Sequence, residues 1–394
     1  MKAAILYGAD AVYLSGQIFG MRAAADNFSL EELRGAVEYA HERSVKVYLT
    51  VNTMPREDEY ELLKKYFNDL KGIAVDALII ADIGVLMLAR EILPEVEIHI
   101  STQANSVSSA DCLAWYKLGA RRVVLARELT LREIKAIRAN IPEELEIECF
   151  IHGSMCISYS GRCLLSGHIV ARDANRGMCA QPCRWNYTIR GYEIAEEKRP
   201  EAAMPVEEIN GETFIMASRD TCTIEHIPEL IEAGINSFKI EGRMKSAYYT
   251  AVVTNTYKMA LDSYFSGNYE YNPQWYRELL SVSHRDYATG YYFSDSHVDA
   301  NTASTTGYIK DKAYLATVLS YDEVTGEAEL SQRNKMCVGD KIELLTPGKV
   351  GVPFVCGELF DENRCEISAT SHPYMKFYMK TPFAVKAGDI IRLA

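Results

Sequence analysis

Short apolar runs alternate with longer amphipathic segments through most of the chain. At four points a helical stretch ends and an apolar, β-branched or aromatic run follows at once, starting from Gly8, Ala74, Gly119 and Gly234. Glycine suits the C-terminal end of a helix, and a short apolar run suits a buried parallel strand. The pattern predicts an α/β fold in which helices connect parallel strands.

At least seven candidate strands occur at this pace, which favours a (β/α)8-type TIM-like barrel over an open sheet. Ser29 with Glu32, and Thr130 with Glu133, have the spacing of capping boxes. Residues 2–7 have a helical pattern directly before the first strand, so the first strand of a barrel is missing from the pattern. The predicted strands include Ala11–Leu14, Val45–Val51, Ile98–Thr102, Leu145–Ile151 and Phe238–Glu241, and the predicted helices include Ser29–Arg43, Glu57–Leu70, Ser106–Leu118, Thr130–Ala139 and Ser246–Phe265.

The alternation changes twice towards the C-terminus. A polar β excursion at about 185–217 interrupts the helix and strand repeat, and from about residue 308 short strands of period two follow one another. Many short strands separated by Gly-containing turns are typical of a small all-β domain. We therefore expect a TIM-like barrel over 1–305, containing the excursion, and a β-barrel domain over 306–394.

Six of the ten cysteines lie between Cys149 and Cys222. The chain has no apolar run long enough to span a membrane and no signal-peptide pattern, which predicts a cytoplasmic protein without a membrane partner. In a reducing compartment, clustered thiols more often bind metal than form disulfides. The cysteines therefore indicate a metal centre.

Four of these cysteines are spaced as Cys156-x6-Cys163 and Cys179-x3-Cys183. Zinc and iron–sulfur clusters both accept four thiolates, but zinc ribbons generally use two tight pairs, so the wide first pair favours a [4Fe–4S] cluster. Zinc stays open as an alternative. Cys222 is an alternative ligand that could replace Cys179.

The cysteine segment follows the strand Leu145–Ile151, at the end of a barrel strand where active sites of this fold lie. The net charge of −12 argues against a protein that coats nucleic acid, yet this segment is rich in arginine. The local positive charge points to an anionic substrate. The candidate substrate-binding residues are Arg172, Arg176, Arg184, Gln103 and Tyr159, of which Gln103 is suited to read a base edge and Tyr159 to stack on a base.

Three further residues are candidates for catalysis. Glu241 and Arg243 end the strand Phe238–Glu241, and the guanidinium suits a dicarboxylate or an RNA phosphate. The alternative for this pair is a surface ion pair. His152, at the end of the strand Leu145–Ile151, is the third candidate.

The run Glu148-Cys-Phe-Ile-His-Gly-Ser-Met-Cys156, followed by Gly161-Arg-Cys163-Leu-Leu-Ser166, resembles the signature of the collagenase-like family known as peptidase family U32. The likeness extends to Lys239-Ile-Glu-Gly-Arg-Met-Lys245 and to the C-terminal β domain. It implies a [4Fe–4S] cluster on Cys156, Cys163, Cys179 and Cys183, and oxygen-independent hydroxylation of RNA. The implied reaction forms 5-hydroxyuridine at the tRNA wobble position, with prephenate, a small dicarboxylate, as the source of the hydroxyl group. Members begin with one more strand, which this chain lacks.

Two alternatives remain open. The family name suggests a collagenase-like peptidase, but the zinc-peptidase motif His-Glu-x-x-His is absent, and His152 and Ser154 are too close in sequence to form a typical nucleophile and base pair. The other alternative is a non-catalytic protein that binds RNA or a partner through its β domain. The sequence does not define a protein partner.

Overall fold

The computed structural model describes residues 1–21, 27–156, 158–184, 194–196, 199–204, 207–209, 212–214, 218–267, 269–293, 309 and 312–394. The described chain forms two compact units, each built from segments that are distant in sequence. The parallel-sheet unit comprises Ala11–Arg243 and Arg285–Gly307. The C-terminal unit comprises Met1–Asp10, Met244–His284 and Tyr308–Ala394.

Six parallel strands pair in the order of the sequence in the parallel-sheet unit, and a seventh parallel strand, β12 (Ser237–Ile240), pairs with the last of them. In β3 all four residues are apolar and buried, as expected for a parallel strand that is covered on both faces. The six strands are β1 (Ala11–Ser15), β2 (Lys46–Val51), β3 (Ala77–Ile80), β4 (Glu97–Ile100), β5 (Arg122–Val124) and β6 (Glu146–Ser154).

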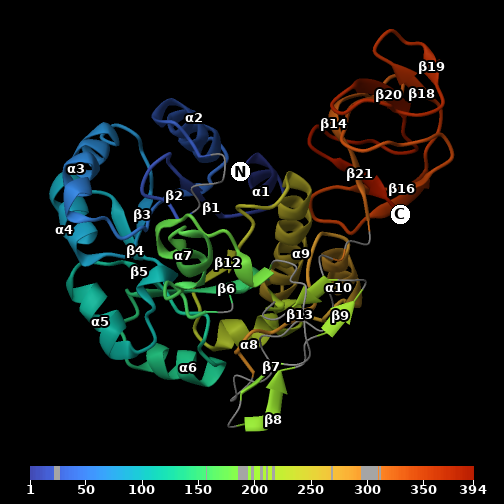
Figure 1. Ribbon diagram of the computed structural model, residues 1–394. Helices are drawn as coiled ribbons and strands as arrows, with labels where there is room; N and C mark the ends of the chain where they lie inside the picture. Colours follow the sequence, from blue (N-terminus) through green and yellow to red (C-terminus); the bar gives the residue numbers. More distant parts are fainter. Residues whose placement is uncertain are drawn as a thin grey trace. The chain divides into compact units, whose positions relative to one another are not determined.

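Helices follow these strands and form an outer arc around them in Figure 1. The predicted capping boxes are confirmed at two helices: Ser29 caps α2 and Thr130 caps α6. In each box the glutamate side chain accepts a hydrogen bond from the backbone N–H of the capping residue. The helices of this unit are α2 (Leu30–His41), α3 (Tyr60–Asp69), α4 (Ile83–Ile92), α5 (Ser109–Lys117), α6 (Leu131–Ala139), α7 (Leu165–Val170) and α8 (Ile227–Glu232).

The sheet is more complex at β6. Strand β11 (Asp220–Cys222) runs antiparallel to the end of β6 and parallel to β13 (Tyr287–Ala288), giving nine strands in all. The α/β architecture with parallel strands is therefore confirmed. Among the pairings of the described strands, none joins β1 to β12 or β13, so the closure of a TIM-like barrel stays a prediction.

Part of the β excursion expected at about 185–217 is described. It contains two short antiparallel pairs, and the rest of that segment lies outside the described residues. The pairs are formed by β7 (Ile194–Glu196) with β8 (Arg199–Met204), and by β9 (Glu207–Ile209) with β10 (Glu212–Phe214).

The C-terminal unit contains an eight-stranded antiparallel sheet, which confirms the expected all-β segment. The C-terminal unit also contains three helices, α1 (Lys2–Leu6), α9 (Ala247–Phe265) and α10 (Pro273–Leu280). The expected boundary at 305/306 had assigned these helices to the barrel domain. The strands are β14 (Tyr314–Asp322), β15 (Glu327–Gln332), β16 (Lys341–Leu345), β17 (Val352–Val355), β18 (Leu359–Asp361), β19 (Glu366–Ile367), β20 (Lys376–Lys380) and β21 (Ile390–Leu393).

A buried arginine joins α10 to this sheet. Arg392 on β21 is 1% exposed, and its guanidinium donates to Glu278 of α10 (2.8 Å) and to Glu343 of β16 (2.8 Å). A buried guanidinium requires such partners because removing its charge from water is costly. This ion pair explains why a helix distant in sequence belongs to the C-terminal unit. No helix among the described residues is both long enough and apolar enough to cross a bilayer.

Candidate functional site

A small polar cavity lies in the parallel-sheet unit, where several strands end. Its walls come from β1, the loops after β2, β4 and β5, the middle of β6, and the end of β12. In folds of this class, the carboxyl ends of parallel strands form the ligand site. The lining residues are Tyr13, Met21, Thr50, Asn52, Ile79, Ser101, Thr102, Gln103, Val124, Arg127, Phe150, Lys239, Glu241 and Arg243.

Glu241 is fixed at the cavity wall by two hydrogen bonds. The hydroxyl of Tyr13 donates to Glu241 Oε2 (2.9 Å), and the backbone N–H of Arg243 donates to Oε1 (3.3 Å). The Arg243 guanidinium donates to the side-chain oxygen of Asn27. Glu241 and Arg243 both line the cavity, and each is positioned by a hydrogen bond.

Lys239 connects the cavity to a buried ion cluster. Its ammonium donates to Glu148 Oε1 (2.6 Å) and lies 4.6 Å from the centre of the Tyr13 ring. Glu148 Oε2 accepts from Arg122 (3.0 Å) and from the Ser237 hydroxyl (2.9 Å). Burial alone would raise the pKa of Glu148, but Lys239 and Arg122 outweigh it and lower the pKa to about 2.

The cysteine segment, defined here as residues 153–184, packs against the wall of the cavity through three glycines of positive φ, Gly153, Gly161 and Gly177. A methyl group on Gly153 would lie 2.7 Å from the Glu241 carbonyl oxygen, and one on Gly161 would lie 2.5 Å from that of Gln103. One on Gly177 would lie 3.2 Å from the Cα of Met21.

All three neighbours, Glu241, Gln103 and Met21, line the cavity. Glycine is needed at these positions both for the backbone conformation and for the close approach. The segment therefore packs behind three residues of the cavity wall, and none of its own described residues lines the cavity.

Serine 166 holds two parts of the cysteine segment together. It is fully buried in α7, and its hydroxyl accepts a hydrogen bond from the backbone N–H of Ala180 (3.0 Å). This bond ties the helix that follows Cys163 to the loop that carries Cys179 and Cys183.

The four thiols of the predicted cluster form no disulfide and are half-buried. The backbone N–H of Gln181 donates to Cys179 Sγ (3.3 Å), the type of hydrogen bond that stabilises a thiolate or a cluster sulfur. Among the described residues, no three His, Cys, Asp or Glu side chains converge closely enough to hold a metal ion. The donor chemistry suits soft-metal binding, and the convergence of the four thiols stays a prediction.

The sequence profile described as peptidase family U32 matches residues 1–302, and that of the peptidase family U32 C-terminal domain matches 310–392. The chain belongs to peptidase family U32. The signature that carried the resemblance now has a structural explanation: its first residue, Glu148, is the centre of the buried ion cluster, and its last, Ser166, bonds to the loop that carries Cys179. Lys239, which opens the second family motif, is the partner of Glu148.

Similar proteins of the family carry different names. A Bacillus subtilis protein named tRNA hydroxylation protein P1 is 38% identical over 398 residues, covering 100% of this chain and 92% of that protein. An Escherichia coli protein named tRNA hydroxylation protein P is 35% identical over 384 residues, covering 88% and 84%. A Porphyromonas gingivalis protein named Collagenase is 33% identical over 364 residues, covering 88% and 84%.

The structure brings three of the predicted site residues together: Gln103, Glu241 and Arg243 line the cavity. His152 does not line it. That histidine is 1% exposed within β6, and its Nε2 lies 3.4 Å from the hydroxyl of Tyr287. Cys222 is buried in β11 opposite His152.

The predicted substrate-binding residues of the cysteine segment have different environments. Tyr159 is 48% exposed and Arg172 is exposed, so both are accessible to a large substrate. Arg176 instead donates to Glu59 Oε1 (2.6 Å), which already balances its charge. The side chain of Arg184 lies outside the described residues.

Other residues of the cavity were missed by the sequence reasoning, although a signal existed. Asn52, Ser101 and Arg127 each stand within three residues of the end of a parallel strand, as Gln103 does. The rule that selected Gln103 would have selected them too. Tyr13 gave no such signal, because it lies inside β1.

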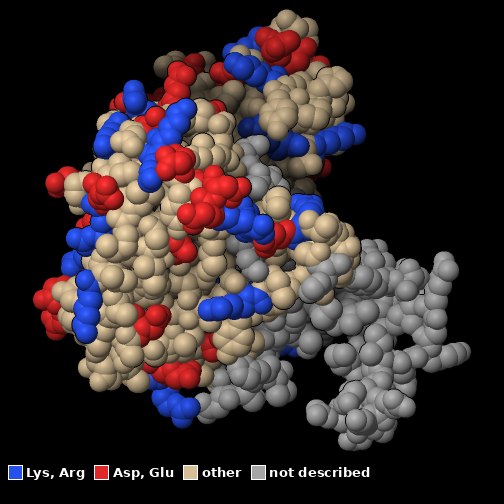
Figure 2. All heavy atoms as spheres, turned by 60° about the vertical axis from the view of Figure 1, so that its left-hand side comes forward, with Lys and Arg blue, Asp and Glu red and all other residues tan. Residues whose placement is uncertain are grey.

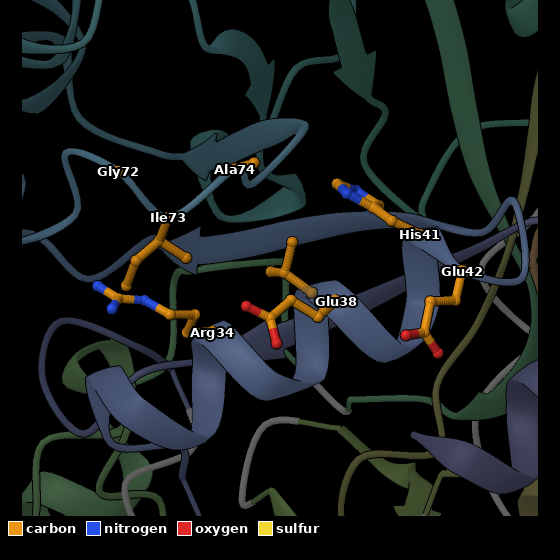
Figure 3. Close-up of a pocket in the computed structure, with 8 residues that line it drawn as sticks. Arg34, Glu38, His41, Glu42, Gly72, Ile73 and Ala74 are labelled. Carbon is orange, nitrogen blue, oxygen red and sulfur yellow. The ribbon is translucent and has the colours of Figure 1, made fainter.

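A second cavity, of about 360 Å³, lies at the other ends of the strands. It is lined by one face of α2 and by Gly72–Ala74, which precede β3, and Figure 3 shows Arg34 and Glu38 of α2 facing Ile73. Its charged residues are of both signs, and none of the described signature residues from Glu148 to Ser166 lines it. Because ligands of this fold class bind at the carboxyl ends of the strands, we assign no function to this cavity.

The pH dependence of stability should depend on His99, a buried residue beside the ion cluster. Burial, Arg122 and Lys239 lower the pKa of His99 from 6.5 to about 3, and Glu148 opposes them. The unfolded chain therefore binds a proton that the folded chain excludes, and stability falls as the pH drops below 6.5. We expect wild type to lose about 2 kcal/mol more than His99→Gln between pH 6.5 and 4.5, measured by urea unfolding.

His372→Gln is the matched control, because His372 is an exposed histidine of the C-terminal unit. This variant should follow the wild-type pH curve. Parallel curves for wild type and His99→Gln would show that His99 is protonated in the folded protein.

Proposed function

We propose that this chain is an RNA hydroxylase that forms 5-hydroxyuridine at the tRNA wobble position. A [4Fe–4S] cluster would be held by Cys156, Cys163, Cys179 and Cys183, and prephenate would supply the hydroxyl group. A tRNA substrate places the enzyme in the cytoplasm. The names of the relatives support RNA hydroxylation, including that of an Escherichia coli 23S rRNA 5-hydroxycytidine synthase, which is 38% identical over 267 residues.

One observation carries the proposal. The cysteine segment approaches the polar cavity at three glycines, each against a residue of the cavity wall. This contact supports a proposal in which a soft-metal donor set and a pocket for a small polar molecule serve one reaction. A hydrolase has no need of four thiols in that place, whereas a redox enzyme does.

The reaction requires a redox group. Loss of carbon dioxide aromatises prephenate and expels its hydroxyl group as hydroxide. Exchange of the C5 hydrogen of uridine for this hydroxide releases one proton and two electrons, which an external electron carrier must take up. A [4Fe–4S] cluster supplies one-electron transfer when it is bound. The four thiolates of the cysteine segment are the residues suited to hold it.

The cavity residues have roles in binding and proton transfer in this proposal. Arg243 and Lys239 attract a carboxylate of the co-substrate, and Gln103 donates to or accepts from the edge of the base. Glu241 takes the proton released from the base, and the hydrogen bond from Tyr13 to its Oε2 positions the carboxylate at the cavity wall. Tyr159, on the exposed surface of the segment, stacks on an unpaired base. His152, which is buried beside Tyr287, orients that tyrosine.

The proposal is tested by mass spectrometry of tRNA nucleosides from a strain that lacks the gene. We expect less 5-hydroxyuridine at the wobble position, restored by wild type and not by Glu241→Gln. Unchanged hydroxyuridine, together with cleavage of a peptide by the purified protein, would support a collagenase-like peptidase instead. Restoration by Glu241→Gln and by variants without cluster ligands would support a non-catalytic RNA-binding protein.

The affinity for tRNA should depend on the exposed arginine of the cysteine segment. Arg172→Ala is expected to weaken binding and to lower the salt dependence of the affinity, because one phosphate contact is lost. Arg176→Ala should have a smaller effect, since Arg176 is paired with Glu59. Filter binding at several salt concentrations measures both.

The salt dependence should be shallow for wild type. The protein is acidic overall, and basic and acidic side chains alternate over the face drawn in Figure 2. Contacts are therefore restricted to a few phosphates. Equal losses for Arg172→Ala and Arg176→Ala would contradict this assignment.

A further inference from the structure

Arg127 contacts both the cavity and the cysteine segment. It follows β5 and lines the cavity, where its guanidinium lies 5.6 Å from the centre of the Phe150 ring. Its Nε donates to the Ser160 hydroxyl (3.3 Å) and its Nη1 donates to the Ser154 carbonyl (3.4 Å). Ser154 and Ser160 flank Cys156 on its two sides, so one guanidinium holds both ends of the turn that carries this thiol.

The next residue contacts the same turn but not the cavity. Glu128 Oε1 accepts from the backbone N–H of Ser160 (3.0 Å), and Glu128 is not among the residues that line the cavity. Ser160 itself is 1% exposed. Arg127 and Glu128 therefore form a natural pair for comparison: both hold the turn, and Arg127 alone reaches the ligand space.

The two bonds from Arg127 to the turn are long and have neutral acceptors. A carboxylate that enters the cavity offers the same guanidinium charge-assisted bonds, which are shorter and roughly twice as strong as neutral ones. The cavity suits such an anion, because the guanidinium groups of Arg127 and Arg243 line it against one carboxylate, Glu241, while the ammonium of Lys239 is already paired with Glu148. Binding of an anion is therefore expected to draw the guanidinium from Ser154 and Ser160.

We propose that Arg127 is a positioning residue that couples occupancy of the cavity to the turn carrying Cys156. When the cavity is empty, Arg127 stays bonded to the turn and holds the thiol of Cys156 in place. When a small carboxylate binds in the cavity, the guanidinium bonds to it instead of to Ser154 and Ser160, and the turn becomes more mobile. This coupling deepens the proposed function, on which it rests, by giving the co-substrate a route to the cluster ligands.

Hydrogen–deuterium exchange of the full-length protein, as purified, tests the coupling, with malonate as the probe and chloride at equal ionic strength as the control. We expect malonate to speed exchange severalfold in the peptide that contains residues 154–163 of wild type. Arg127→Gln and Arg127→Lys should show no such response. Glu128→Gln should exchange faster than wild type without malonate and still respond to it, and Ser160→Ala should behave in the same way.

An absent response to malonate in wild type, or an equal response in Arg127→Gln, would overturn the coupling. A purely structural role for Arg127 would raise the basal exchange of its variants and leave the malonate response intact, which also overturns it. Hydroxyuridine is measured separately in the complemented deletion strain. A malonate response without hydroxyuridine formation would reject the hydroxylase and keep the coupling, and the reverse result would reject only the coupling.

Discussion

Replacing Cys156 by serine is expected to remove most of the iron from anaerobically purified protein and to reduce 5-hydroxyuridine to the level of the deletion strain. Serine is a poor ligand for a soft metal centre, and a cluster with four protein thiolates has no spare ligand. Iron and sulfide analysis, visible absorption and nucleoside mass spectrometry measure the effect. Cys163→Ser, Cys179→Ser and Cys183→Ser should behave in the same way, and wild type should hold about four irons.

Two cysteines of the C-terminal unit provide the control. Cys365 is exposed and Cys337 is half-buried on β-sheet connections distant in sequence from the signature, so serine at either position should change neither iron content nor hydroxyuridine. Stoichiometric zinc after anaerobic reconstitution with iron and sulfide, without charge-transfer absorption, would contradict the cluster.

Cys222→Ser decides the ligand set. Cys222 is buried in β11 and pairs in register with His152, which fits a core thiol. If this variant loses its iron while Cys179→Ser keeps it, the predicted set is wrong by one residue.

Local signals in the sequence were sufficient for much of the fold. The capping boxes at Ser29 and Thr130 were predicted because each depends on residues three apart, and both helices begin there. Strand β16 lies in the segment where strands of period two were expected. Its apolar residues Ile342 and Leu344 are buried, and Lys341 and Glu343, which alternate with them, are not. Gly8, Gly119 and Gly234 marked the ends of helices for the same reason, because the conformation there is set by neighbours in sequence.

Long-range contacts were not accessible in this way. The pairing of Arg392 with Glu278 joins residues 114 apart, and it places α10 with the C-terminal sheet. No local pattern distinguishes a helix that packs on that sheet from one that packs on the parallel strands. The same limit applies to Tyr13, whose hydroxyl reaches Glu241 across 228 residues.

The site was predicted to the extent that its residues follow strand ends. Gln103, Glu241 and Arg243 were found by that rule, and they line one cavity. Glu148 was recognised only as a residue of the family signature, because its structural role depends on Lys239, which lies 91 residues later in the chain. A buried carboxylate in a strand is a signal in itself, since such a group requires a cation nearby.

Glu148→Gln is expected to cost about 3–5 kcal/mol in the free energy of unfolding at neutral pH, because it leaves Lys239 buried without its carboxylate. Lys239 and Glu148 side chains are 10% and 5% exposed, so water replaces little of the lost interaction. Denaturant unfolding followed by circular dichroism measures the loss. Glu146→Gln is the control: Glu146 pairs with the same Arg122, but its side chain is 29% exposed, and its loss should cost about 1 kcal/mol or less.

The pH dependence and a double substitution separate the ion cluster from simple packing. The pKa of Glu148 is lowered to about 2 from 4.5, so its contribution to stability is fully present above pH 4.5 and is lost as the pH falls towards 2. Glu148→Gln should lack this component. Glu148→Met with Lys239→Met should recover most of the stability, because no buried charge is left unpaired, but it should not recover hydroxylation, since Lys239 lines the cavity. A double variant as unstable as Glu148→Gln would show that shape, not charge pairing, determines the requirement for these two residues.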